Sequence, residues 1–208
     1  FFNSEKPILF PDITYAFYDV WAELYRIPYK TCPLKEDWHI DPKDYLQENG
    51  GIVIANPNAP TGLEESQEVI EEIIKANRDS VVIVDEAYVD FGGTSAIPLI
   101  EKYDNLLVVQ TFSKSRSMAG LRIGFAIGNE KLIKYLSDAK FSFNSYTLNL
   151  PAQVLGVEAL RDRKYFEETV QKIINTRERT KSELSKLGFT FPDSKTNFVF
   201  ASHKSVPA

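Results

Sequence analysis

The residues best suited to chemistry lie in one stretch, TFSKSRSMAGLRIG, between Thr111 and Gly124. An apolar run at residues 106–109 precedes it and is typical of a buried strand. Hydroxyl side chains and Lys114 follow that strand, and Arg122 comes eight residues after the lysine. A buried lysine can act as a nucleophile toward a carbonyl carbon, and an arginine beside hydroxyls can hold a phosphate. The pattern favours covalent capture of a phosphorylated aldehyde, with a solvated lysine in a polar loop as the alternative.

Two further loops follow apolar runs in the same way. NPNAPTG comes after residues 52–55, and DEAY comes after residues 81–84. In an open parallel sheet the carboxyl ends of the strands face the ligand crevice. We therefore expect the side chains of all three loops to converge, although they are far apart in the sequence.

The carboxylate of Asp85 ends one of these apolar runs and needs a partner, because an unpaired buried charge is costly. A protonated pyridine nitrogen would suit it and would make the ring an electron sink; a local arginine or a helix cap is the alternative. Paired acids after a strand also occur where metals bind ATP, but the sequence has no GxxxxGK phosphate loop. The phenol of Tyr88 can reach an oxygen on the same ring, or it can pack in the core.

Strands alternate with amphipathic helices along most of the chain, which predicts an α/β fold with a mostly parallel central sheet and helices on both faces. Residues 1–160 are expected to form this large domain, and residues 161–208 a bridging helix with the start of a small α+β domain. We expect strands at residues 189–191 and 197–201 in that second part. Thr14 is a candidate cap for a helix that follows it.

Composition excludes several classes of function. The 208 residues are 43% hydrophobic with a formal net charge of -5, which argues against a nucleic-acid partner. Cys32 is the single cysteine, so no internal disulfide can form and a reducing cytoplasm is expected. No run of about 18 apolar residues is present, so we expect no membrane span. The absence of an initiator methionine predicts a fragment of a longer chain.

The three motifs NPNAPTG, VDEAY and TFSKSRSMAGLRIG, in this order and spacing, resemble the fold-type-I pyridoxal-phosphate aminotransferases, and most closely the histidinol-phosphate aminotransferases. The resemblance covers essentially the whole chain. It implies that Lys114 binds pyridoxal 5'-phosphate covalently and moves the proton between substrate and cofactor. It also implies that Asp85 pairs with the pyridine nitrogen and that Tyr88 donates to the ring 3'-oxygen.

The resemblance implies the remaining cofactor contacts as well. Ser113 and Arg122 would hold the phosphate, with Thr111 beside them, and Tyr15 would stack on the cofactor ring. The family's asparagine for the 3'-oxygen falls at Ala59 here, and an asparagine stands one position earlier, at Asn58. Asn58 is therefore the candidate for that contact, by a one-residue shift or through a water.

The function that the resemblance implies is amino transfer from histidinol phosphate to 2-oxoglutarate in histidine biosynthesis, by a homodimer. The alternatives are another enzyme of this fold, such as an amino-acid-phosphate decarboxylase or an aromatic aminotransferase, and a non-catalytic cofactor-binding regulator. In this family a phosphate-binding Gly-Ser/Thr pair precedes the region present here, and a substrate-binding arginine follows it. We expect the 208-residue fragment by itself to fold but to lack activity.

Overall fold

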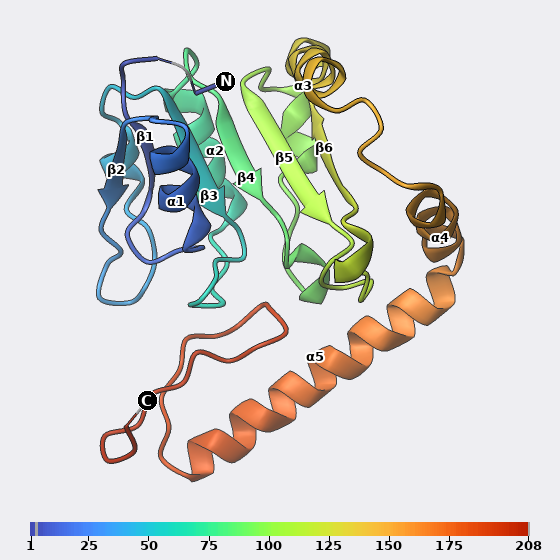
Figure 1. Ribbon diagram of the computed structural model, residues 1–208. Helices are drawn as coiled ribbons and strands as arrows, with labels where there is room; N and C mark the ends of the chain where they lie inside the picture. The colour runs from blue at the N-terminus through green and yellow to red at the C-terminus, as the bar shows by residue number, and fades with distance from the viewer. Residues whose placement is uncertain (3, 208) are drawn as a thin grey trace.

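The computed structural model describes residues 1–2 and 4–207 of the chain. Its centre is a six-stranded sheet in the order β2-β1-β3-β4-β5-β6 (Figure 1). The strands are β1 (Ile8–Pro11), β2 (Tyr29–Cys32), β3 (Gly51–Ala55), β4 (Val82–Asp85), β5 (Leu106–Thr111) and β6 (Gly124–Gly128). The strands β1 to β5 pair in parallel, and β6 pairs antiparallel to β5. The predicted mostly parallel sheet is confirmed.

Helices cover both faces of the sheet. Alternate residues of each strand point to opposite sides, and the apolar side chains on each side pack against helices. On one face, Ile52 and Ile54 join a buried cluster with α2 (Gln67–Ala76). On the other face, Val53 and Ala55 join a cluster with α1 (Phe17–Leu24). Short 3-10 helices complete the layers: η1 (Pro42–Tyr45), η2 (Val89–Phe91), η3 (Ile97–Glu101) and η4 (Ala119–Leu121).

Three helices follow the sheet: α3 (Glu130–Phe143), α4 (Leu150–Arg161) and α5 (Arg163–Lys186). The N-cap residues of these helices are Asn129, Asn149 and Asp162, and the side chain of each accepts a hydrogen bond from a backbone amide of the first turn. The long helix α5 runs past the end of the sheet at which β4 and β5 terminate, and the C-terminal segment returns between the two (Figure 1).

The strands expected at residues 189–191 and 197–201 do not form; among the described residues this region has one isolated antiparallel bridge, between Thr190 and Ser202. Local hydrogen bonds replace the ladder. The Ser194 hydroxyl lies 2.8 Å from the Thr196 hydroxyl and donates to the Phe198 carbonyl at 2.6 Å. Serine and threonine side chains commonly compete with sheet pairing in this way.

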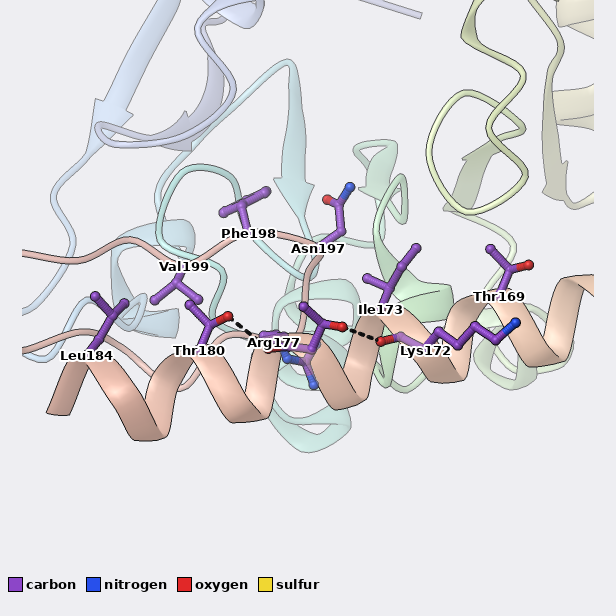
Figure 2. Close-up of a pocket in the computed structure, with 10 residues that line it drawn as sticks. Thr169, Lys172, Ile173, Arg177, Thr180, Leu184, Asn197, Phe198 and Val199 are labelled. Atoms are coloured by element: carbon purple, nitrogen blue, oxygen red, sulfur yellow. Dashed lines mark hydrogen bonds between the residues drawn. The ribbon is translucent and has the colours of Figure 1, made fainter. Parts of the chain in front are cut away.

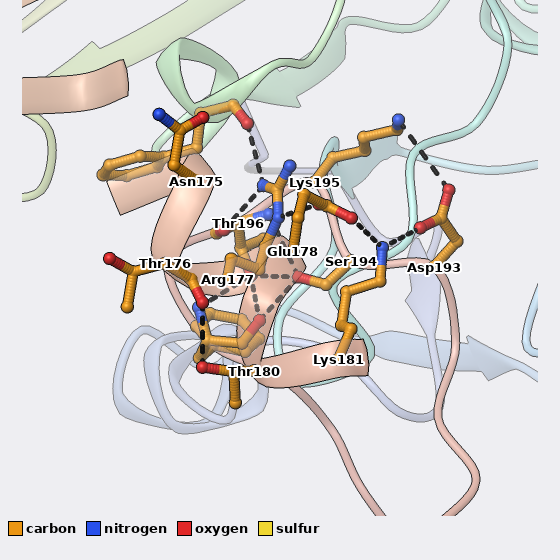
Figure 3. A network of polar contacts seen from close by, with 12 residues as sticks. Asn175, Thr176, Arg177, Glu178, Thr180, Lys181, Asp193, Ser194, Lys195 and Thr196 are labelled. Atoms are coloured by element: carbon orange, nitrogen blue, oxygen red, sulfur yellow. Dashed lines mark hydrogen bonds and ion pairs between the residues drawn. The ribbon is translucent and has the colours of Figure 1, made fainter. Parts of the chain in front are cut away.

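Arg177 of α5 holds this segment against the rest of the fold (Figure 3). The side chain is 7% exposed, and its Nη1 donates to the Phe91 and Thr196 carbonyls, both at 2.8 Å. Its Nε donates to Glu178 at 2.8 Å. The segment also reaches the NPNAPTG loop, where the Lys195 amide donates to the Gly62 carbonyl at 2.7 Å.

Candidate active site

The three loops predicted to converge do meet, at the carboxyl ends of β3, β4 and β5. They surround a cavity of about 360 Å³ together with the start of α1 and the η4 turn. Seven of the eight residues predicted for the site line it: Tyr15, Asp85, Tyr88, Thr111, Ser113, Lys114 and Arg122. The eighth, Asn58, is not part of the lining, and its neighbour Ala59 is.

Asp85 is a largely buried carboxylate at the end of β4. Its Oδ2 accepts from the Tyr18 phenol at 2.7 Å, and its Oδ1 accepts from the Ala87 amide at 3.1 Å. Burial raises the pKa of Asp85, and the bonds from Tyr18 and Ala87 and the charge of Lys114 oppose that rise. Among the described residues no basic side chain forms an ion pair with it, so this carboxylate can take a cationic ring nitrogen from the cavity.

Lys114 lies just beyond β5, with its Nζ 5.0 Å from the centroid of the Tyr88 ring. Tyr88 in turn packs edge-on against Phe198 of the C-terminal segment, with 5.2 Å between ring centroids. The neighbouring Ser115 hydroxyl donates to Asp90, which fixes the lysine loop to the turn that follows Tyr88. The amine and the phenol therefore share one wall of the cavity.

Hydroxyl and guanidinium groups also line the cavity. The Thr111 hydroxyl lies 2.8 Å from the Ser113 hydroxyl, and the Ser113 amide donates to the Thr111 hydroxyl at 3.0 Å. Arg122 is exposed and donates to the Ala119 carbonyl at 3.0 Å. Its φ of 56° lies in the left-handed region, where a residue other than glycine is strained. Such strain is concentrated at functional sites, and here it places a guanidinium at the cavity.

Asn58 has a different set of partners from the one expected. Its amide nitrogen donates to the Ile13 carbonyl at 3.0 Å and to Thr61 at 3.1 Å, and its oxygen accepts from the Thr14 hydroxyl at 2.8 Å. Thr14 therefore does not cap α1, whose N-cap is Ala16 without a side-chain bond. These bonds tie the NPNAPTG loop to the residues that precede Tyr15, and they occupy the amide that the 3'-oxygen contact would need.

Sequence reasoning missed Tyr18, Trp21, Gln110 and Ala119. Trp21, Gln110 and Ala119 line the cavity, and Tyr18 touches it through Asp85. The spacing of Tyr15 and Tyr18, three residues apart, was the available signal that their rings lie close together, and the ring centroids are 5.6 Å apart.

A larger hollow, of about 580 Å³, lies between α5 and the segment at residues 197–199 (Figure 2). Two of its three threonines bond to their own helix, because Thr176 and Thr180 donate back to the carbonyls of Lys172 and Thr176, both at 2.8 Å. None of the predicted site residues lines this hollow. The cavity around Lys114 is therefore the candidate active site.

Comparison with known proteins identifies the class that this fold and cavity belong to. The family model of aminotransferase class I and II matches residues 1–207, and the chain belongs to this family. Over 208 residues it is 58% identical to the histidinol-phosphate aminotransferase of Lactococcus lactis subsp. cremoris strain MG1363. The alignment covers all of this chain and 58% of that relative, so the chain spans well under two thirds of its length.

Solved structures show the same fold. The histidinol-phosphate aminotransferase from Clostridium acetobutylicum matches 97% of this chain and 63% of its own, with a TM-score of 0.89 and 27% identity. The histidinol-phosphate aminotransferase from Sinorhizobium meliloti, solved in complex with pyridoxal-5'-phosphate, matches 96% of this chain and 56% of its own, with a TM-score of 0.86 and 22% identity. Within the described part of this chain, no helix is both long and apolar enough to cross a membrane.

Proposed function

We propose that this protein catalyses pyridoxal-phosphate-dependent amino transfer, with histidinol phosphate as amino donor and a 2-oxo acid, 2-oxoglutarate, as acceptor. The observation that carries the proposal is the arrangement of Lys114, Asp85 and Tyr88 around one cavity in a member of the aminotransferase family. The names of relatives at 50–58% identity support histidinol phosphate as the substrate.

The donor set fits pyridoxal phosphate. Asp85 is a buried carboxylate without a basic partner among the described residues, as a protonated pyridine nitrogen requires. Lys114 supplies a primary amine, and Ser113 and Arg122 supply donors for a phosphate. Tyr15 lines the same cavity and is 43% exposed, with Phe17 stacked on its ring at 5.7 Å between centroids. When bound, the cofactor supplies an electron sink for the substrate carbon.

Each of these residues then has a defined task. Asp85 would hold a proton on the ring nitrogen by its negative charge, and Tyr88 would offer its phenol to the ring oxygen. Lys114 would hold the cofactor through its amine, and the same amine would carry a proton to and from the substrate. Ser113 and Arg122 would hold the phosphate.

Borohydride reduction of the purified full-length protein with pyridoxal phosphate, followed by peptide mapping, tests the assignment. The pyridoxyl label should appear on Lys114. Lys114→Ala should remove both the label and transamination of histidinol phosphate, while the exposed Lys131→Ala should change neither. A label on another lysine would refute the site. Release of carbon dioxide from an amino-acid phosphate would instead assign the reaction to a decarboxylase.

The proposed working form is a homodimer in the cytoplasm. Its support is the row of exposed apolar side chains on α4, where Val154, Leu155, Val157 and Leu160 are 47–57% exposed. Sedimentation equilibrium of the purified protein should give twice the chain mass; a monomer at micromolar concentration would contradict this part of the proposal.

A further inference from the structure

One buried phenol, that of Tyr18, does not line the cavity of the proposed site and contacts it through residues that do. The Tyr18 side chain is 5% exposed and does not line the cavity, yet its hydroxyl donates to Asp85 Oδ2 at 2.7 Å. Asp85 stands 67 residues further along the chain, at the end of β4. This bond joins α1, which carries Trp21 at the cavity, to the strand that carries the carboxylate.

Aromatic packing holds the Tyr18 ring in place. Its centroid lies 5.9 Å from that of Phe10 and 5.6 Å from that of Tyr15, both in edge-on geometry. Trp21 packs on the same ring at 6.2 Å. Burial and the charge of Asp85 raise the pKa of the Tyr18 phenol well above its usual value, so the hydroxyl remains a proton donor at physiological pH.

The two oxygens of Asp85 are thus held by two neutral donors, the Tyr18 hydroxyl and the Ala87 amide. Both donors stabilise the ionised carboxylate without neutralising its charge. A basic residue in the place of Tyr18 would have formed an ion pair and reduced the carboxylate's attraction for a cationic ring. A neutral donor orients the carboxylate and leaves its charge available to the cavity.

We propose that Tyr18 is a positioning residue that keeps Asp85 ionised and oriented toward the pyridine nitrogen of the cofactor. The inference rests on the proposed function, because it needs a ring nitrogen for Asp85 to meet. The titratable groups around Asp85 are those of Tyr18 and Tyr15 on the α1 side, Tyr88 after β4, and Lys114 and Arg122 after β5. Of these, Tyr18 makes the only side-chain hydrogen bond to Asp85 among the described residues.

The test uses Tyr18→Phe, which keeps the ring and removes the hydroxyl. Tyr29→Phe is the matched control, because Tyr29 stacks on the same Phe10 ring at 5.4 Å and also donates to a carboxylate, Glu23, at 3.2 Å. In cofactor-free protein, carbon-13 NMR of the Asp85 carboxyl should show its titration moved to higher pH in Tyr18→Phe and unmoved in Tyr29→Phe. Replacing Tyr18 by a fluorinated, more acidic tyrosine should move the titration the other way, which a purely packing role would not do.

Cofactor binding provides the second readout. The dissociation constant of pyridoxal phosphate should rise about tenfold in Tyr18→Phe at neutral pH, as expected for a lost hydrogen bond to a charged group. In an Asp85→Asn background the same substitution should have little further effect, because Tyr18 acts through that carboxylate. An unmoved carboxyl titration, or effects that add in full, would overturn the inference. If neither parent nor variant binds pyridoxal phosphate, the proposed function fails, and the titration alone then decides whether Tyr18 controls Asp85.

Discussion

At the scale of single residues, the site contains carboxylates whose burial costs free energy of folding. Glu86 is a buried carboxylate and its neighbour Asp85 a partly buried one, and burial raises the pKa of each. Glu86 is satisfied by donors from Ser95, Ala96 and Gln110, so its role is to hold the turn after Tyr88. Asp85 accepts only from neutral donors among the described residues and faces the cavity. A cation bound in the cavity would therefore offset the free-energy cost of burying its charge.

Asp85→Asn should separate stability from function. A carboxyl whose folded pKa is raised binds its proton more tightly in the native state than in the unfolded chain, so native stability falls as pH rises above about 4, the ordinary value for aspartate. Asparagine does not ionise, so the substitution removes this loss of stability at higher pH. Cofactor-free Asp85→Asn should be at least as stable as the parent in urea at neutral pH, with a smaller decrease in stability on going up from acid pH.

The same variant should bind pyridoxal phosphate at least about tenfold more weakly, since a charge-assisted contact contributes about 1.5–3 kcal/mol. The rate of amino transfer should fall further than the affinity, because the charge matters most as negative charge develops on the substrate carbon. Steady-state kinetics and equilibrium dialysis measure the two effects. Transamination at the parental rate would contradict the role assigned to Asp85.

At the scale of elements, the lysine loop is attached to the helices that follow it through Arg116. Its guanidinium carbon lies 4.0 Å from the Phe166 ring centroid of α5 and 5.2 Å from that of Phe112. Its Nη1 also donates to the Ala159 carbonyl near the end of α4, at 2.8 Å. One planar side chain two residues from Lys114 therefore joins the residue that follows β5 to α4 and α5.

Arg116→Lys should be far from conservative. An ammonium cannot stack its plane between two rings while it donates to a carbonyl, so we expect a loss of about 1–2 kcal/mol in stability and faster amide exchange at residues 112–118. Arg161→Lys is the matched control, because its pair with Glu158 is exposed and surface pairs contribute about 0–1 kcal/mol. Equal losses in the two variants would show that the stacking is unimportant.

Some features of the fold and the site could be predicted from the sequence, and others could not. The convergence of three loops was predictable, because parallel strands deliver their carboxyl ends to one edge and the apolar runs marked those strands. The Tyr18–Asp85 bond was not, since nothing local relates a helix residue to a strand end 67 positions away. The prediction of strands at residues 189–191 and 197–201 was wrong. Alternating apolar residues do not reveal whether a neighbouring strand is present to pair with. Asn58 shows a third limit: its amide donates to Thr61 in its own loop and to Ile13, a partner that only the tertiary structure brings near.

At the scale of the whole molecule, the C-terminal segment is connected to the cavity through Tyr88. Phe198 packs on Tyr88, and Arg177 bonds both the turn that follows Tyr88 and the segment that carries Phe198. Lys181 of α5 adds ion pairs with Glu178 and Asp193 nearby (Figure 3). The position of α5 and the shape of the cavity wall are therefore set by the same side chain, Arg177.

Arg177→Met should remove the hydrogen bonds that join α5, the turn after Tyr88 and the C-terminal segment. Methionine retains most of the apolar stem but leaves the Phe91 and Thr196 carbonyls without a donor, and each unsatisfied buried group costs about 1–3 kcal/mol. Part of that cost is offset because a buried charge is removed. We expect a net loss of about 2–3 kcal/mol in urea unfolding, faster proteolysis after residue 187, and weaker binding of pyridoxal phosphate through the loosened Tyr88 wall. Arg179→Met, on the exposed side of the same helix, should change stability by less than about 0.5 kcal/mol. If Arg177→Met lost stability but bound the cofactor as the parent does, α5 would support the fold without shaping the cavity.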